Sequence, residues 1–197
     1  MKRRVFFDVD GTLCDLMGPF VDKYNEQHGT NIDISGLTEY DFDKLLPIKP
    51  ESIQDIFASI HYDDVEPFQP MIDAIKLIDE AGYEVIIVTA PMWDHCFQLS
   101  QKKVWLEEKV GHHIPVVVTM DKGILCRAGD ILIDDAPRFL EQWIEQGGVA
   151  IRVKQPWNTE YSNANYSVSV DEYAGHNILN FINRLSPQKW IIAGEQT

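Results

Sequence analysis

The sequence predicts an α/β fold of three layers, in which helices cover a parallel β-sheet, with a small helical cap inserted after the first strand. Three observations support this prediction: short runs rich in Val and Ile recur along the chain, segments with helical spacing separate them, and one long segment lacks a strand signal. We therefore expect an α/β core formed by residues 1–14 and 70–197, and a cap formed by residues 15–69.

Five apolar runs are the predicted strands. Their apolarity is continuous rather than alternating, which is typical of strands that are buried on both faces of a parallel sheet. The runs are RVFFDV (4–9), YEVIIVTA (83–90), IPVVVT (114–119), DILIDD (130–135) and GVAIRV (148–153).

Three segments between these runs are predicted to be helices. Residues 70–82 repeat isoleucine at helical spacing between a proline and a glycine, which are common signals for the start and the end of a helix. Residues 97–111 place Leu99 and Val104 on one apolar stripe, and residues 136–148 begin near a proline and end at paired glycines. The alternation of strands and helices favours right-handed crossover connections.

Residues 15–69 interrupt this alternation. The stretches PFVDKYNEQHG (19–29) and PESIQDIFASI (50–60) have helical character, and a polar, turn-rich sequence separates them. Because the whole segment is too long for a simple crossover, we expect it to form the helical cap.

The composition limits the partners of this chain. A formal net charge of −14 argues against a nucleic-acid polymer or an anionic membrane, so a small anion would need a metal ion or a local cluster of cations. The three cysteines, Cys14, Cys96 and Cys126, have no ligand-like spacing, and no apolar run is long enough to span a bilayer. We expect a cytoplasmic protein with reduced thiols and a small-molecule substrate, and a homodimer is compatible with this sequence.

Polar residues gather where four of the predicted strands end. Ligands of parallel sheets bind beyond the carboxyl ends of the strands, so these residues are expected to share one rim. Each has a simpler explanation by itself, because an Asp in this position is often a helix N-cap and a single lysine is usually solvated. The residues are Asp8, Asp10, Gly11 and Thr12, then Thr89 and Ala90, then Asp121 and Lys122, and finally Asp134 and Asp135.

The carboxylates of this rim predict a magnesium site. Asp8, Asp10, Asp134 and Asp135 would repel one another, and each would raise the pKa of its neighbours, unless a hard divalent cation lay among them. Mg²⁺ takes oxygen ligands of this kind, and Gly11 would let the backbone approach the ion closely. We therefore expect Mg²⁺ as the cofactor.

The same residues are suited to covalent phosphoryl transfer. A carboxylate at Asp8 that stays ionised beside the metal can attack phosphorus. Asp10, two residues later, can protonate the leaving-group oxygen as a general acid and then activate water as a general base. Thr89 and Lys122 would hold and neutralise the phosphoryl oxygens.

The pattern of Asp8-Val-Asp10-Gly-Thr12, Thr89, Lys122 and Asp134-Asp135 resembles the four motifs of the haloacid dehalogenase (HAD) superfamily of phosphatases. More specifically, VTAPMWDH, KKVWLEEKVG, VTMDKG and LIDDAP, in this order, resemble the 5′(3′)-deoxyribonucleotidase family. The resemblance covers residues 4–140 well, the cap weakly and the C-terminal third hardly at all. It implies a Rossmann-like core and an Mg²⁺-dependent phosphatase for nucleoside monophosphates, with deoxyribonucleotides favoured.

The resemblance also implies a role for each matching residue. Asp8 would be the nucleophile and a metal ligand, and Asp10 would be the general acid/base and would give the metal its backbone carbonyl. Asp135 would bind the metal directly, with Asp134 in support. The residues that would bind phosphate are Thr89, Lys102 and Lys122.

The substrate pocket departs from the family pattern. Mammalian members present an aromatic residue that stacks on the base shortly after the first motif, where this chain has Leu16. We expect the base platform to come from the cap, at Tyr40, Phe42 or Phe68, with Ala90 also in the pocket. Specificity is then expected to depend on the cap and on the loop 91–95.

Three alternatives compete with this interpretation. A phosphatase of the same fold could act on another small phosphate ester, such as a sugar phosphate. A non-catalytic phospho-acceptor switch domain also groups aspartates, a threonine and a lysine on an α/β sheet. The third alternative is a dehalogenase of the same fold. Neither a dehalogenase nor a switch domain needs a general acid at Asp10. A switch domain also has no counterpart of the cap.

Overall fold

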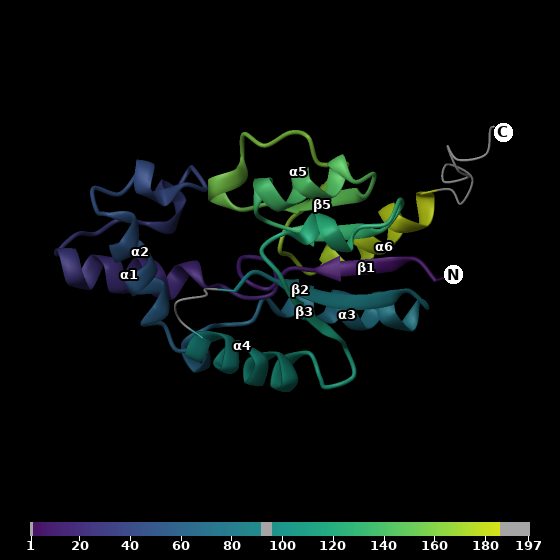
Figure 1. Ribbon diagram of the computed structural model, residues 1–197, viewed down its shortest axis with the longest axis horizontal. Helices are drawn as coiled ribbons and strands as arrows, with labels where there is room; N and C mark the ends of the chain where they lie inside the picture. Colours follow the sequence, from purple (N-terminus) through teal and green to yellow (C-terminus); the bar gives the residue numbers. More distant parts are fainter. Residues whose placement is uncertain (1, 92–95, 186–197) are drawn as a thin grey trace.

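A computed structural model of the chain describes residues 2–91 and 96–185, and its core is a six-stranded parallel sheet with the strand order β3-β2-β1-β4-β5-β6 (Figure 1). All five predicted strands are present, and the α/β fold class is confirmed. The strands are β1 (Arg4–Phe7), β2 (Glu84–Thr89), β3 (Val116–Val118), β4 (Ile131–Asp134), β5 (Val149–Val153) and β6 (Tyr166–Val168).

Helices connect these strands, and each predicted helix lies within one or two turns of its expected bounds. The α-helices are α1 (Met17–His28), α2 (Pro50–Ala58), α3 (Gln69–Glu80), α4 (Cys96–Lys109), α5 (Pro137–Glu145) and α6 (Ala174–Arg184). Short 3₁₀ helices are η1 (Ile34–Gly36), η2 (Phe42–Lys44), η3 (Tyr62–Asp64), η4 (Lys122–Leu125) and η5 (Pro156–Asn158).

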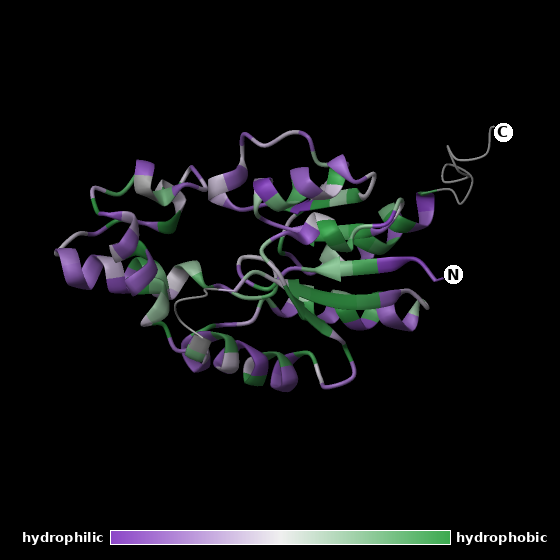
Figure 2. Cartoon of the chain, viewed as in Figure 1, coloured by the Kyte–Doolittle hydropathy of each residue, from purple (hydrophilic) through white to green (hydrophobic). Residues whose placement is uncertain are grey.

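The two faces of the sheet carry separate apolar clusters. On β1, Val5 and Phe7 belong to the cluster that contains α3 and α6, whereas Phe6 belongs to the cluster formed with α5. Phe6 meets Trp143 of α5 edge to face, at 4.8 Å between ring centroids. Figure 2 shows the hydrophobic strands enclosed by helices with polar outer faces. Burial on both faces explains why the strand sequences are continuously apolar.

The edge strand β3 differs from the prediction. Residues 114–119 were expected to be buried on both faces, but Val116 is 44% exposed and Val118 is 36% exposed. The reason is that β3 pairs only with β2 and ends the sheet. Val104 on the neighbouring α4 is also exposed, so it does not belong to the apolar stripe predicted for that helix.

Two elements, β6 and α6, were not predicted from the sequence. The strand β6 contains Ser167 between Tyr166 and Val168, so it lacks the continuous apolar run from which the other strands were predicted. Tyr166 of β6 stacks on Phe181 of α6 at 4.6 Å, and α6 packs closely on α3, where a Cβ at Gly175 would lie 3.0 Å from the Cα of Ala74. The strand β6 adds a sixth strand beside β5, and α6 joins the apolar cluster that contains α3.

The segment between β1 and α3 contains only helices among its regular elements, and it lies beyond the carboxyl edge of the sheet (Figure 1). Phe20 of α1 stacks on Phe57 of α2 at 4.4 Å and on Phe42 at 6.0 Å. These aromatic contacts hold the helices of this segment together. The division of the chain into core and cap at residues 15 and 69 stays a prediction.

In the part of the chain that the structure describes, no helix combines the length and the apolar composition that crossing a bilayer requires. The loop residues 92–95, which were expected to contribute to specificity, lie outside the described residues.

Candidate active site

The turn after β1 places the first two aspartates. The amide of Asp8 donates to the carbonyl of Ile133 on β4, at 2.9 Å, and the chain then turns tightly at Gly11, which has φ of 75°. A Cβ at Gly11 would lie 2.7 Å from the carboxyl carbon of Asp135. Only glycine therefore combines this backbone conformation with so close an approach to Asp135.

Three carboxylates converge at the carboxyl ends of β1 and β4. Asp8, Asp134 and Asp135 are buried, and each offers an oxygen atom within 4.8 Å of the other two. Lys122 of η4 lies beneath them, fully buried, and donates to Asp8 Oδ1 at 2.5 Å and to Asp134 Oδ2 at 2.6 Å. We call Asp8, Lys122, Asp134 and Asp135 the carboxylate cluster.

The carboxylate cluster has an excess of negative charge. Burial raises the pKa of Asp8 to about 7, and the charges of Asp134 and Asp10 act in the same direction against Lys122. Burial, together with Asp134 and Asp8, raises the pKa of Asp135 well above its usual range. Burial would lower the pKa of Lys122, but its two carboxylate partners outweigh that effect and raise it. One ammonium group does not balance three carboxylates.

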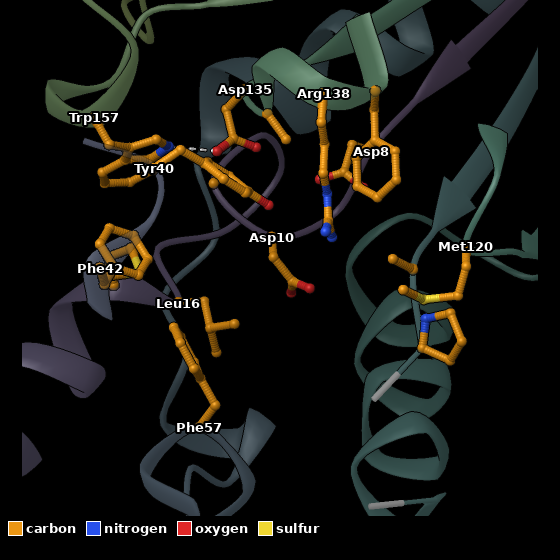
Figure 3. A pocket seen from close by; sticks show the side chains of 16 residues that line it. Asp8, Asp10, Leu16, Tyr40, Phe42, Phe57, Met120, Asp135, Arg138 and Trp157 are labelled. Atoms are coloured by element: carbon orange, nitrogen blue, oxygen red, sulfur yellow. Dashed lines mark hydrogen bonds between the residues drawn. The ribbon is translucent and has the colours of Figure 1, made fainter. Parts of the chain in front are cut away.

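Residues after β5 orient Asp135. The indole Nε1 of Trp157 donates to Asp135 Oδ2 at 2.7 Å (Figure 3), and the side-chain amide of Asn158 donates to the Asp135 carbonyl at 2.7 Å. Asp134 Oδ1 accepts from the amide of Ala136 at 2.8 Å, which is the turn-forming contact that is common for an Asp before a helix. Trp157 and Asn158 were not predicted from the sequence, because they lie in η5, which is part of none of the motifs.

The donor set of the carboxylate cluster fits a hard divalent cation. Its three carboxylates are close together, and burial, with the neighbouring negative charges in support, raises the pKa of two of them. Oxygen ligands of this kind suit Mg²⁺. The carboxylate of Asp10, which the sequence analysis grouped with these three, is bound elsewhere.

Asp10 belongs to a second group of contacts. Lys102 of α4 donates to Asp10 Oδ2 at 2.6 Å and to Thr89 Oγ1 at 3.0 Å, and the Tyr62 hydroxyl donates to Asp10 Oδ1. We call Asp10, Tyr62, Thr89 and Lys102 the Asp10 network. Thr89 and Lys102 were predicted from the sequence, whereas Tyr62 was not.

A cavity of about 240 Å³ opens above Asp8, Asp10 and Asp135 (Figure 3). Leu16, Tyr40, Phe42 and Ala90, the predicted pocket residues, all line it, but Phe68 does not. Phe68 directly precedes α3 and, like Tyr40 and Phe42, is partly buried against the core. Lining residues that the sequence analysis missed include Phe57, Met120, Arg138 and Trp157.

Arg138 is the one cationic side chain among the described residues that line this cavity. It lies on the first turn of α5, and its guanidinium carbon is 4.5 Å from the ring centroid of Phe139 and 5.7 Å from that of Tyr40. A positive charge is unfavourable at the N-terminus of a helix. This unfavourable placement, three residues after Asp135, is the sequence signal that could have identified Arg138.

The fold is similar to that of HAD-superfamily hydrolases. A haloacid dehalogenase-like family hydrolase from Streptococcus pneumoniae aligns with a TM-score of 0.63 at 14% identity, over 91% of this chain and 98% of that chain. A HAD family hydrolase from Deinococcus radiodurans, solved with bound phosphate and sodium, aligns with a TM-score of 0.62 at 13% identity, over 92% and 96% of the two chains. This likeness confirms the predicted HAD-like fold.

A family model assigns the chain more narrowly. The model of the 5′ nucleotidase, deoxy (pyrimidine), cytosolic type C protein matches residues 2–175, and the chain belongs to this family. The cytosolic type of human 5′(3′)-deoxyribonucleotidase is 27% identical over 144 residues, covering 67% of this chain and 70% of the human protein. The human mitochondrial form is also 27% identical, over 68% of this chain and 62% of its own length. Both the predicted resemblance and the predicted class, a phosphoric monoester hydrolase, are confirmed.

Proposed function

We propose that this protein is an Mg²⁺-dependent phosphatase that hydrolyses nucleoside monophosphates, with deoxyribonucleotides favoured, through a phosphoryl group carried on Asp8. The observation that supports it best is the position of Asp8 and Asp10 on one cavity, where each carboxylate has different partners. Two carboxyl groups in different surroundings can take different roles in one reaction.

In the first step, an oxygen of the Asp8 carboxylate attacks phosphorus and forms a P–O bond. The bond between phosphorus and the ester oxygen breaks, and the carboxylic acid of Asp10 gives its proton to that oxygen, so the product leaves as an alcohol. The phosphoryl group remains on Asp8.

In the second step, the Asp10 carboxylate takes a proton from a water molecule, and the oxygen of this water attacks phosphorus. The bond between Asp8 and phosphorus breaks, which releases inorganic phosphate and restores the Asp8 carboxylate. Asp10 ends the cycle protonated, as it began. Thr89, Lys102 and Lys122 bind the phosphoryl oxygens in this proposal.

Asp8, Asp134 and Asp135 would hold the Mg²⁺, with the backbone carbonyl of Asp10. When bound, the ion neutralises the carboxylates and the phosphoryl oxygens, which allows two anions to approach each other. Lys122 keeps Asp8 and Asp134 in place from beneath, because it donates to both.

The side chains that line the cavity favour a substrate that carries a planar, apolar group. Tyr40, Phe42 and Trp157 lie on one side of the pocket, and Leu16 and Phe57 lie nearby (Figure 3). Aromatic rings of this kind can stack on a base. In this proposal the segment 15–69 closes over the mouth of the cavity and sets the specificity.

A second candidate function is hydrolysis of a smaller phosphate ester, such as a sugar phosphate. The observation in its favour is the cavity volume of about 240 Å³, which lies below the range of about 300–1,000 Å³ that is usual for ligand pockets.

The cytoplasmic location and the homodimer that were expected from the sequence stay predictions.

The test compares kcat/KM for a panel of deoxyribo- and ribonucleoside monophosphates and sugar phosphates, in Mg²⁺ and after metal removal with EDTA. We expect a deoxynucleoside monophosphate to be the best substrate and EDTA to abolish turnover. A sugar phosphate that is preferred tenfold, about 1.4 kcal/mol in transition-state binding, would replace the nucleotidase proposal by the second candidate.

A further inference from the structure

Tyr62 is a buried residue that connects the linker before α3 to the floor of the cavity. Its side chain is 1% exposed, and its hydroxyl donates to Asp10 Oδ1 across 52 residues of sequence. A buried phenol needs such a partner, since an unpaired hydroxyl in the interior is costly.

Three residues on α4 hold Tyr62 in place. The backbone amide of Tyr62 donates to Gln101 Oε1 at 3.2 Å, the Lys102 ammonium lies 5.5 Å from the centre of its ring, and Trp105 meets the ring edge on at 6.5 Å. Trp105 is itself fixed, because its indole donates to the carbonyl of Val65 at 3.0 Å. The hydroxyl of Tyr62 therefore points in one direction.

The two oxygens of Asp10 have different partners. Oδ1 is bound by the rigid Tyr62, whereas Oδ2 is bound by Lys102, whose ammonium also contacts Thr89. A phosphoryl group that enters the site would compete for the Lys102 ammonium, because it carries more negative charge than one carboxylate. That exchange would free Oδ2 and leave Oδ1 bound.

We propose that Tyr62 is a positioning residue for the general acid: its hydroxyl holds Oδ1 of Asp10, so that Oδ2 faces the leaving-group oxygen when Lys102 turns to the phosphoryl group. This inference rests on the proposed function.

The test uses Tyr62→Phe, which removes only the hydroxyl. A nucleotide needs a proton on its leaving oxygen, whereas p-nitrophenolate departs without one, so only the nucleotide depends strongly on a well-placed acid. We expect kcat/KM for thymidine 5′-monophosphate to fall about tenfold more than kcat/KM for p-nitrophenyl phosphate. The parameter kcat/KM is used because it reports on the step in which the leaving group departs.

Tyr83→Phe is the matched control, since the Tyr83 hydroxyl also donates to one side-chain oxygen, that of Asn183 at 2.7 Å, and neither residue lines the cavity. We expect this variant to keep the wild-type ratio of the two kcat/KM values. A second comparison places Tyr62→Phe in an Asp10→Asn background, where we expect no further change in the ratio, because the acid is already lost.

Two results would overturn the role of Tyr62 and leave the proposed function intact. The first is an equal loss of kcat/KM on both substrates in Tyr62→Phe. The second is that Tyr62→Phe changes the ratio of the two kcat/KM values by the same factor in the Asp10→Asn background. A wild-type protein that hydrolyses neither substrate would refute the proposed function, and this inference with it.

Discussion

The carboxylate cluster and the Asp10 network both contribute aspartates to the same cavity, but the two groups are built in different ways. In the carboxylate cluster, Lys122 is fully buried and pairs with two carboxylates at the ends of core strands. In the Asp10 network, the Asp10 side chain is 30% exposed, and two of its partners come from α4 and from the linker before α3. The fixed group suits a nucleophile, and the group with exchangeable partners suits a residue that must pass a proton.

The largest expected effect is in the carboxylate cluster. Asp8→Asn should abolish turnover, with a loss of at least about 10⁴-fold in kcat, because an amide cannot form the phosphoryl intermediate. The measurement is release of inorganic phosphate, with circular dichroism to show that the variant is folded. A variant with nearly normal kcat would exclude Asp8 as the nucleophile.

The corresponding change in the Asp10 network should be smaller. Asp10→Asn removes the acid and base but leaves Asp8 in place, so we expect kcat to fall on the order of 10²–10⁴-fold. Affinity for inorganic phosphate, measured by calorimetry, should change little. If Asp10→Asn lost phosphate binding instead, the residue would be part of the binding site rather than the acid.

The two lysines should differ in their effect on stability. Lys122→Met leaves its carboxylate partners without a cation in the interior, so the free energy of unfolding should fall by about 3–5 kcal/mol. Lys102→Met should cost less, because water can reach the partly exposed Asp10. The measurement is urea unfolding of both variants. Equal losses in the free energy of unfolding would show that the carboxylate cluster and the Asp10 network are equally rigid.

The effect of metal removal on stability should be the smallest of these effects, and it should depend on pH. Burial raises the pKa of Asp8 from 3.8 to about 7 in the folded protein. Between these values the native state holds a proton that the unfolded state has lost, so in EDTA this group contributes stability at low pH that disappears as the pH rises through about 7. Mg²⁺ should therefore raise the melting temperature more at about pH 8 than at about pH 5. A shift that is the same at both pH values would contradict the metal site.

The sequence predicted the carboxylate cluster better than the Asp10 network, for a physical reason. Asp8, Lys122, Asp134 and Asp135 each lie at or just after a strand, so the topology of a parallel sheet is enough to bring them together. Tyr62 of the Asp10 network reaches the site only through tertiary packing, which leaves no local pattern in the sequence. The same holds for Trp157, which binds Asp135 of the carboxylate cluster.

The same distinction applies to the fold. The interior strands are continuously apolar and their helices have apolar residues at helical spacing. In contrast, Ser167 interrupts β6, and β3 at the edge of the sheet has two exposed valines. Phe68 does not line the cavity, whereas Tyr40 and Phe42 do, and residue type alone does not distinguish these three aromatic residues of the segment 15–69.

The most direct test of the account is a phosphoryl group on Asp8 in the Asp10→Asn variant. With p-nitrophenyl phosphate, the first step needs little help from an acid, but the second needs the base, so the intermediate should accumulate. After rapid acid quenching, mass spectrometry should find one added phosphoryl group on the peptide that contains Asp8, and none in an Asp8→Asn control. Turnover of the Asp10→Asn variant with no phosphorylated peptide, or with the phosphoryl group on another residue, would contradict the central claim.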